Sequence, residues 1–255
     1  MLVDIQHRGS IALLLLNNPR EHNSLSGALV QDMLFALHSD RVQKSRALII
    51  GGMGKSFCAG ANIQDLLAQG WMEGHNAESN PVALFRQLMN DPRPVIGAVD
   101  GLALGGGFEL ALSCDLVVAS DRASFSLPEA GHGVIPNTGL ALLSQTIGRR
   151  RALEWMMTLR RIPAQEALAL GLVNDVVSSE TLLDQAVNTA ETIISACAPG
   201  ALREIKNSLN KHAAIDWQEV NESLGRIPKE QWQEGLSAFL ERRRPDYEDF
   251  WSKHA

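Results

Sequence analysis

The chain has 255 residues, enough for one large domain or for a domain with a smaller appendage. Hydrophobic residues make up 45% and charged residues 20%, as in an ordinary globular protein, and the net charge of −6 argues against nucleic acid or an anionic membrane as the main partner. The aliphatic run Ile11–Leu16 is far too short to span a bilayer, and the three widely spaced cysteines favour a reduced, cytoplasmic setting over a disulfide framework.

Short apolar runs bounded by Gly, Pro, Asn or Asp predict buried strands at Ile11–Leu16, Ala47–Ile50, Pro94–Val99 and Asp115–Ala119. Helices are predicted between several of these runs, at Ser26–Ser39, with Ser26 as a cap, and at Gly106–Ser113. Strands that alternate with helices in this way indicate an α/β core. The stretch Gln69–Asn80 has no periodicity and carries Gly, Asn and Ser, which is typical of a mobile loop.

From about Glu180 the pattern becomes helical, and a charged amphipathic helix is predicted over Pro228–Arg244. We place a soft boundary near Ala196–Gly200. It divides the chain into an α/β core of residues 1–196 and a helical C-terminal region of residues 197–255.

The stretch "LIIGGMGKSFCAGANI", residues 48–63, raises the question of a nucleotide phosphate loop. That loop needs a glycine five positions before its Gly-Lys pair, and here the pair is Gly54-Lys55 and the required position holds Ile49. A turn-like "FCAGA" also stands where a helix should begin. The spacing therefore excludes a phosphate loop, and the small residues of "CAGAN" instead allow a backbone to approach a ligand closely.

A second glycine run, "DGLALGGGFELALSCD", leads from a predicted strand into a short apolar helix. Three glycines there are typical either of a helix packed closely on a sheet or of free backbone amides that face a ligand. Glu109 favours the second interpretation, because it is the only charged group in the helix and a mostly buried carboxylate needs a partner or a task. The alternative is a solvated glutamate in the first turn of the helix.

A second carboxylate, Glu129, follows Pro128 among small and apolar residues. Two semi-buried glutamates on glycine-rich segments are candidates for paired acid–base chemistry. Cys58 is interpreted as a small buried thiol rather than a nucleophile, and His132 as a packed or solvated side chain that could reach a pocket. The seven histidines are scattered, so no metal is proposed.

The segments "GKSFCAGANI", "GLALGGGFELALSCDLVVASDRASFSLPE", "GLVNDVV" and "EGLSAFLERRRP" resemble the crotonase superfamily, and most closely its enoyl-CoA hydratases. The similarity covers nearly the whole chain in the same order. It implies a spiral of ββα units followed by a helical region that forms trimers, often paired as hexamers. It also implies an acyl-CoA thioester as substrate, with CoA present only as part of that substrate and with no permanently bound cofactor.

The resemblance also implies roles for individual residues. The backbone N–H groups of Ala61 and Gly106 would bind the thioester oxygen, while Glu109 and Glu129 would hold a water over the double bond. Glu109 would act as the base on that water, and Glu129 would exchange the proton at carbon 2, although the two could share these roles. The residues expected to contact CoA are Ala59, Ala61, Asn62, Ile63 and Gly106, together with Phe239 and Arg242 from the same or a neighbouring subunit.

The sequence departs from the family pattern in ways that leave the substrate open. Asn62 and Gln64 stand where the family often has Asp and Lys, Asn137 replaces a glycine near the expected catalytic water, and His132 occupies a usually apolar place. A hydratase or dehydratase is the first hypothesis. The alternatives are double-bond isomerisation, a carnitinyl-CoA dehydratase-like reaction on a polar acyl chain, and a non-catalytic homologue that binds acyl-CoA or RNA.

Overall fold

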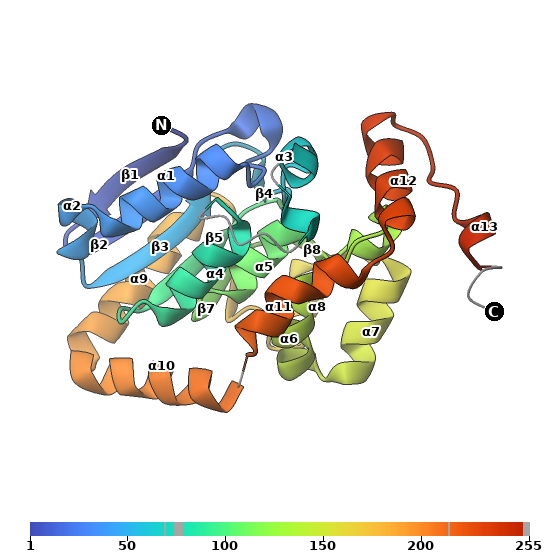
Figure 1. Ribbon diagram of the computed structural model, residues 1–255. Coiled ribbons are helices and arrows are strands. Elements are labelled where there is room, and N and C mark those ends of the chain that lie inside the picture. Colours follow the sequence, from blue (N-terminus) through green and yellow to red (C-terminus); the bar gives the residue numbers. More distant parts are fainter. Residues whose placement is uncertain (69, 74–78, 214, 252–255) are drawn as a thin grey trace.

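The computed structural model describes residues 1–68, 70–73, 79–213 and 215–251, and within them the strands form two sheets (Figure 1). The six-stranded sheet has the order β1 (Val3–Arg8), β2 (Ile11–Leu16), β3 (Ala47–Gly52), β5 (Val95–Val99), β7 (Leu116–Ser120) and β10 (Asp175–Val177). The four-stranded sheet has the order β4 (Ser56–Cys58), β6 (Leu102–Leu104), β8 (Ser124–Ser126) and β9 (Ile162–Pro163). Only the outer pairs β1–β2 and β8–β9 are antiparallel among these strands.

A repeating unit connects the two sheets. Each of β3, β5 and β7 is followed by one strand of the smaller sheet, β4, β6 or β8, and then by helical segments. These segments are α3 (Ile63–Ala68) and α4 (Pro81–Asn90) in the first unit, α5 (Gly106–Leu112) in the second, and the 3₁₀ turn η3 (Glu129–His132) with α6 (Asn137–Ile147) in the third. The α/β spiral of ββα units is thereby confirmed.

The central strands read as continuous apolar runs because both faces of the larger sheet are covered. Along β2, Ile11 and Leu13 pack toward α9 (Leu182–Ala196), while Ala12 and Leu14 face the main core. That core also contains residues of α1 (Gly27–His38), α4 and α5. The alternation places the sheet between two helical layers.

The elements outside these layers complete the fold (Figure 1). The remaining helices are α2 (Asp40–Gln43), α7 (Arg149–Thr158), α8 (Ala164–Ala169), α10 (Pro199–Ala213), α11 (Trp217–Ser223), α12 (Lys229–Leu240) and α13 (Glu248–Trp251). The remaining 3₁₀ turns are η1 (Pro19–Glu21), η2 (Trp71–Glu73) and η4 (Leu224–Arg226). In the part of the chain described here, no helix is long and apolar enough to cross a membrane.

Several sequence predictions are confirmed with small shifts. The first predicted strand coincides with β2, and the Ser26 hydroxyl caps α1 by accepting from the Leu29 N–H at 3.2 Å. The predicted tail helix is shorter than expected, because the chain leaves α12 after Leu240 and Arg242 takes a left-handed φ of 54°. Of the predicted loop 69–80, residues 69 and 74–78 lie outside the described residues.

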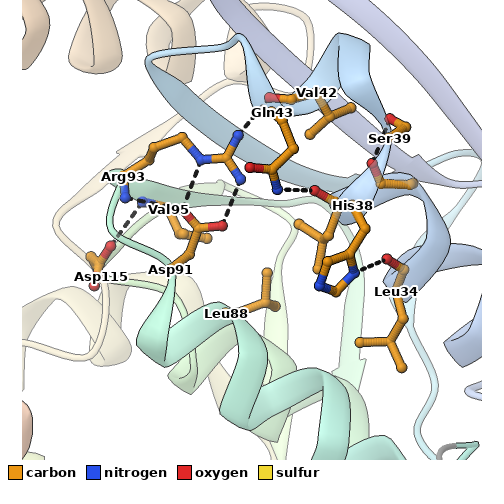
Figure 2. Close-up of polar contacts among 12 residues, drawn as sticks. Leu34, His38, Ser39, Val42, Gln43, Leu88, Asp91, Arg93, Val95 and Asp115 are labelled. Carbon is orange, nitrogen blue, oxygen red and sulfur yellow. Dashed lines mark hydrogen bonds and ion pairs between the residues drawn. The ribbon is translucent and has the colours of Figure 1, made fainter.

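Polar contacts fix the loop between α4 and β5, as Figure 2 shows. The partly buried Arg93 side chain forms an ion pair with Asp91 at 2.6 Å and also donates to the Val42 carbonyl. Asp115 accepts from the Val95 N–H at 2.8 Å and pairs with Lys206 of α10 at 2.7 Å. Because the partly buried Lys206 ammonium also donates to the Leu88 carbonyl, this one side chain ties α10 to the α/β core.

The last helices lie to one side of the sheets (Figure 1), yet α12 packs closely on η3. A methyl group at Gly235 would lie 2.1 Å from the His132 carbonyl oxygen, and one at Gly133 would lie 2.5 Å from the Gln231 oxygen. Glycine at both positions therefore lets the tail contact the segment that carries Glu129.

Candidate active site

Two backbone N–H groups lie side by side where β4 ends and α5 begins. Ala61 forms an isolated parallel bridge with Leu25, in which the Leu25 N–H donates to Gly60 at 2.7 Å and the Asn62 N–H donates to Leu25 at 3.0 Å. This pattern gives the Ala61 N–H no acceptor. A methyl group built at Gly106 would lie 3.3 Å from the Ala61 nitrogen. In the described ranges, neither the Ala61 nor the Gly106 N–H has a protein acceptor.

The glycines of this region allow close packing of the backbone as well as leaving N–H groups free. Gly60 has a φ of +100°, and a methyl group there would lie 2.8 Å from the Leu104 carbonyl oxygen. A methyl group at Gly107 would lie 2.0 Å from the Cys58 oxygen, so α5 can approach β4 only without a side chain at that position. Close packing at the glycine run is therefore confirmed, and it brings the two free amides together.

Glu109 is buried in the first turn of α5, with only 5% of the residue exposed. The alternative of a solvated glutamate at the start of the helix is wrong. Its Oε1 accepts from the Gly139 N–H at 2.7 Å, at the start of α6. Burial raises the pKa of Glu109 to about 7, and the backbone N–H groups of Gly139 and Thr138 oppose that rise. The start of α6 thus keeps this carboxylate ionisable near neutral pH.

Glu129 lies in η3 above the glycine run. Its Oε1 is 2.8 Å from the position that a methyl group on Gly105 would occupy, and Gly105 has a φ of +51°, which favours glycine there. Its Oε2 is buried and has no hydrogen-bond partner among the described residues. Burial, and then the charge of Glu109, raise the pKa of Glu129 well above its ordinary value. The two carboxyl groups are therefore electrostatic neighbours in different environments, one bonded to a helix start and the other unpartnered.

Both glutamates and both free amides line one cavity of about 390 Å³. Part of its wall is an apolar cluster from segments distant in the sequence, which includes Leu66, Trp71, Met72, Val134 and Leu224. Besides the two glutamates, the wall residues with polar side-chain atoms include Asn80, His132, Asn137 and Arg161, and Trp71 adds an indole nitrogen. The cavity thus combines an apolar surface with a few polar groups, as small-molecule sites do.

The remaining predicted site residues fall into two groups. Ala59, Ile63 and Phe239 line the cavity, and the Phe239 ring meets the His132 ring edge-on at 5.1 Å within the same chain. Asn62 instead caps α3, since its Oδ1 accepts from the Gln64 and Asp65 N–H groups at 3.0 and 3.2 Å. Arg242 is exposed beyond the end of α12, outside the cavity wall.

Sequence reasoning missed Asn80, Arg161 and Leu224 as wall residues. Asn80 carries a local signal, because it precedes Pro81 and caps α4 by accepting from the Val82 N–H, but that signal indicates a helix start and not a site. Cys58 is fully buried, and burial raises the pKa of its thiol to about 12, in agreement with a packing role.

Comparisons with known proteins identify the family to which the chain belongs. The family model for enoyl-CoA hydratase/isomerase matches residues 6–250. The chain belongs to the enoyl-CoA hydratase/isomerase family. This confirms the crotonase resemblance seen in the sequence.

Three similar proteins show the range of the family. A short-chain-enoyl-CoA hydratase from Clostridium acetobutylicum is 34% identical over 95% of this chain and 95% of its own length. A carnitinyl-CoA dehydratase from Proteus mirabilis is 34% identical over 94% of this chain and 95% of its own length. A solved structure of methylmalonyl-CoA decarboxylase in complex with 2-nitronate-propionyl-CoA superposes with a TM-score of 0.85 at 30% identity, covering 96% of this chain and 98% of that chain.

Proposed function

We propose that the protein is an enoyl-CoA hydratase, which adds water reversibly to a 2-enoyl-CoA thioester. The observation that carries this proposal is the convergence of two unbonded backbone N–H groups, at Ala61 and Gly106, with two buried glutamates on one cavity. Such amides stabilise an oxyanion, and a pair of carboxyl groups with separated pKa values supplies a base and an acid.

In the proposed reaction, the thioester oxygen accepts from the Ala61 and Gly106 N–H groups. Glu109 removes a proton from water as the water oxygen bonds to carbon 3, and the electrons of the double bond move to the thioester oxygen to form an enolate. Glu129 then donates a proton to carbon 2, which restores the thioester carbonyl. Each oxyanion donor contributes about 3–4 kcal/mol of transition-state stabilisation.

The environments of the glutamates support this division of roles. Glu129 accepts no hydrogen bond at its buried Oε2, so it retains its proton more readily and suits the donor. Glu109 is bonded to the start of α6, so it ionises first and suits the base. The two groups titrate as a coupled pair, so the roles belong to the pair as a whole.

The direct test is water addition to crotonyl-CoA, followed by loss of the absorbance of the conjugated thioester and by mass spectrometry of the product. We expect a product heavier by one water. A shifted double bond with no water added would instead favour the isomerase alternative, and loss of water from carnitinyl-CoA with no reaction of crotonyl-CoA would favour the dehydratase alternative. Binding of RNA or acyl-CoA without turnover of any thioester would identify a non-catalytic homologue.

The CoA portion of the substrate is proposed to lie along Ala59, Ala61 and Ile63, with Phe239 beside its path. The first three belong to the segment that supplies an oxyanion donor, and all four line the cavity. Asn62 and Arg242, also expected at the CoA site, lack that support, because Asn62 caps α3 and Arg242 lies outside the wall.

We also propose that the chain forms a homotrimer or a dimer of trimers through residues 197–255. The support is α10, an amphipathic helix on which Ile205 is 58% and Leu209 is 65% exposed, beside a hollow of about 870 Å³ that both residues line. Light scattering at micromolar concentration should give the mass of three or six chains. A monomer would contradict the oligomerisation role of the tail.

A further inference from the structure

Trp71 and Asn80 line the cavity, and each carries a side-chain nitrogen donor that has no acceptor among the described residues. Within the described part of the chain, the Trp71 Nε1 atom is buried without a hydrogen-bond partner, and the residue is only 2% exposed. Asn80 is 8% exposed, and its Oδ1 accepts from the Val82 N–H at 3.0 Å as the cap of α4. Because the cap fixes which end of the amide is the oxygen, the Nδ2 group is the free end, and it has no acceptor among the described residues.

A buried donor without an acceptor is costly, so such groups are few in folded proteins. An unpaired indole nitrogen alone does not mark a site, since Trp155 has one in the main core, away from this cavity. The distinguishing feature of Trp71 is that a second nitrogen without an acceptor among the described residues, Asn80 Nδ2, belongs to a residue of the same cavity wall. Glu129, another wall residue, also has an unpartnered atom, Oε2, among the described residues. The proposed reaction already accounts for that atom, because Glu129 exchanges a proton with the substrate.

The surroundings restrict the chemistry of the missing acceptor. The neighbouring wall residues Met72, Val82 and Phe85 are apolar, so they offer an acyl chain contact area but no polar atom on their side chains. An all-carbon chain would leave both donors unpaired. A carboxylate would place a further negative charge in the cavity of Glu109 and Glu129 while meeting only neutral donors at Trp71 and Asn80. A neutral oxygen satisfies both donors without that penalty.

We propose, on the basis of the proposed function, that the acyl chain of the substrate carries a neutral oxygen, a hydroxyl or a ketone, which accepts hydrogen bonds from Trp71 Nε1 and Asn80 Nδ2. These two residues determine acyl specificity, and they are separate from the groups that act on carbons 2 and 3. Sites that are built to hydrogen-bond a substrate oxygen reject analogues that lack it, because the donors of the site then remain unpaired.

The experiment measures binding and does not depend on turnover. Dissociation constants are determined by calorimetry for hexanoyl-CoA and for counterparts in which the end of the chain carries a hydroxyl, a methyl ketone or a carboxylate. We expect the hydroxyl or ketone form to bind about tenfold more tightly than hexanoyl-CoA, as one satisfied buried donor predicts.

Two variants and one control assign that preference. Trp71→Phe removes the indole N–H, and Asn80→Asp removes the amide donor while keeping an oxygen that can cap α4. Each variant should lower, severalfold, the ratio of the dissociation constant of hexanoyl-CoA to that of the hydroxyl or ketone form. Trp155→Phe removes the other unpaired indole N–H outside the cavity and should leave that ratio unchanged.

The inference is overturned if the wild-type protein binds hexanoyl-CoA as tightly as the oxygen-bearing forms, if the carboxylate form binds most tightly, or if the ratio survives both cavity variants. It also fails if Trp155→Phe changes the ratio as much as Trp71→Phe does. Failure of the proposed function is a separate result, because absence of water addition to every enoyl-CoA would leave the binding ratios measurable.

Discussion

Glu129→Gln should lower turnover of crotonyl-CoA by about 10²–10⁴-fold, the usual contribution of a general acid or base. Glutamine has nearly the same shape but has no proton to donate to carbon 2. In the described ranges the buried Oε2 of Glu129 has no partner, so the substitution breaks no hydrogen bond there at that atom. The measurement is steady-state kcat and KM together with calorimetric binding of CoA, which should survive. Near wild-type turnover would show that Glu129 is not the proton donor.

The pH dependence of kcat/KM tests the assignment of Glu109 as base and Glu129 as acid independently. With Glu109 as base and Glu129 as acid, the active form has Glu109 ionised and Glu129 protonated. Wild-type kcat/KM should therefore rise with pH as the coupled pair loses its first proton, near the pKa of about 7 at Glu109, and fall at higher pH as the second is lost. In Glu129→Gln the fall at high pH should disappear, and a retained bell-shaped profile would contradict the assignment.

Gly106→Pro should reduce kcat/KM by about 10²–10³-fold, because it removes one of the two oxyanion donors. Gly106 is the first residue of α5, the position where proline is best tolerated in a helix, so the helix should persist. The measurement is kcat/KM on crotonyl-CoA, with circular dichroism to confirm that the fold is retained.

The matched control is Gly106→Ala, which adds bulk but keeps the N–H. Its methyl group would lie 3.3 Å from both the Ala61 nitrogen and Leu25 Cδ1, so a smaller loss is expected from crowding alone. Equal losses in the alanine and proline variants would mean that crowding, and not the missing donor, explains the effect.

The sequence predicted those parts of the fold whose signals are local. β2 is a six-residue apolar run between polar turns, and α1 begins at a serine cap, so both were found near their observed bounds. The three-residue strands β4, β6 and β8 were not found, because three residues are too few to show a period of two. Each of them follows a strand of the larger sheet in the chain, a relation that appears only once the fold is known.

The residues of the candidate site likewise differ in whether the sequence carries a local signal for them. Glu109 and Glu129 could be selected because a lone carboxylate in an apolar stretch is unusual wherever the chain folds. Asn80 and Leu224 carry no such signal, since one is an ordinary helix cap and the other an ordinary leucine until the fold brings them to the same cavity. The pairing of Phe239 with His132 likewise depends on the contact between α12 and η3.

The close fit of α12 on η3 affects when this protein can first work during its synthesis. The cavity takes its wall from residues as early as Ala59 and as late as Phe239, so a ribosome must release almost the entire polypeptide before the chamber can close. Contacts so far apart along the chain form slowly during folding. A nascent or clipped product that ends before Leu224 would retain both glutamates but would have an open, unfinished chamber.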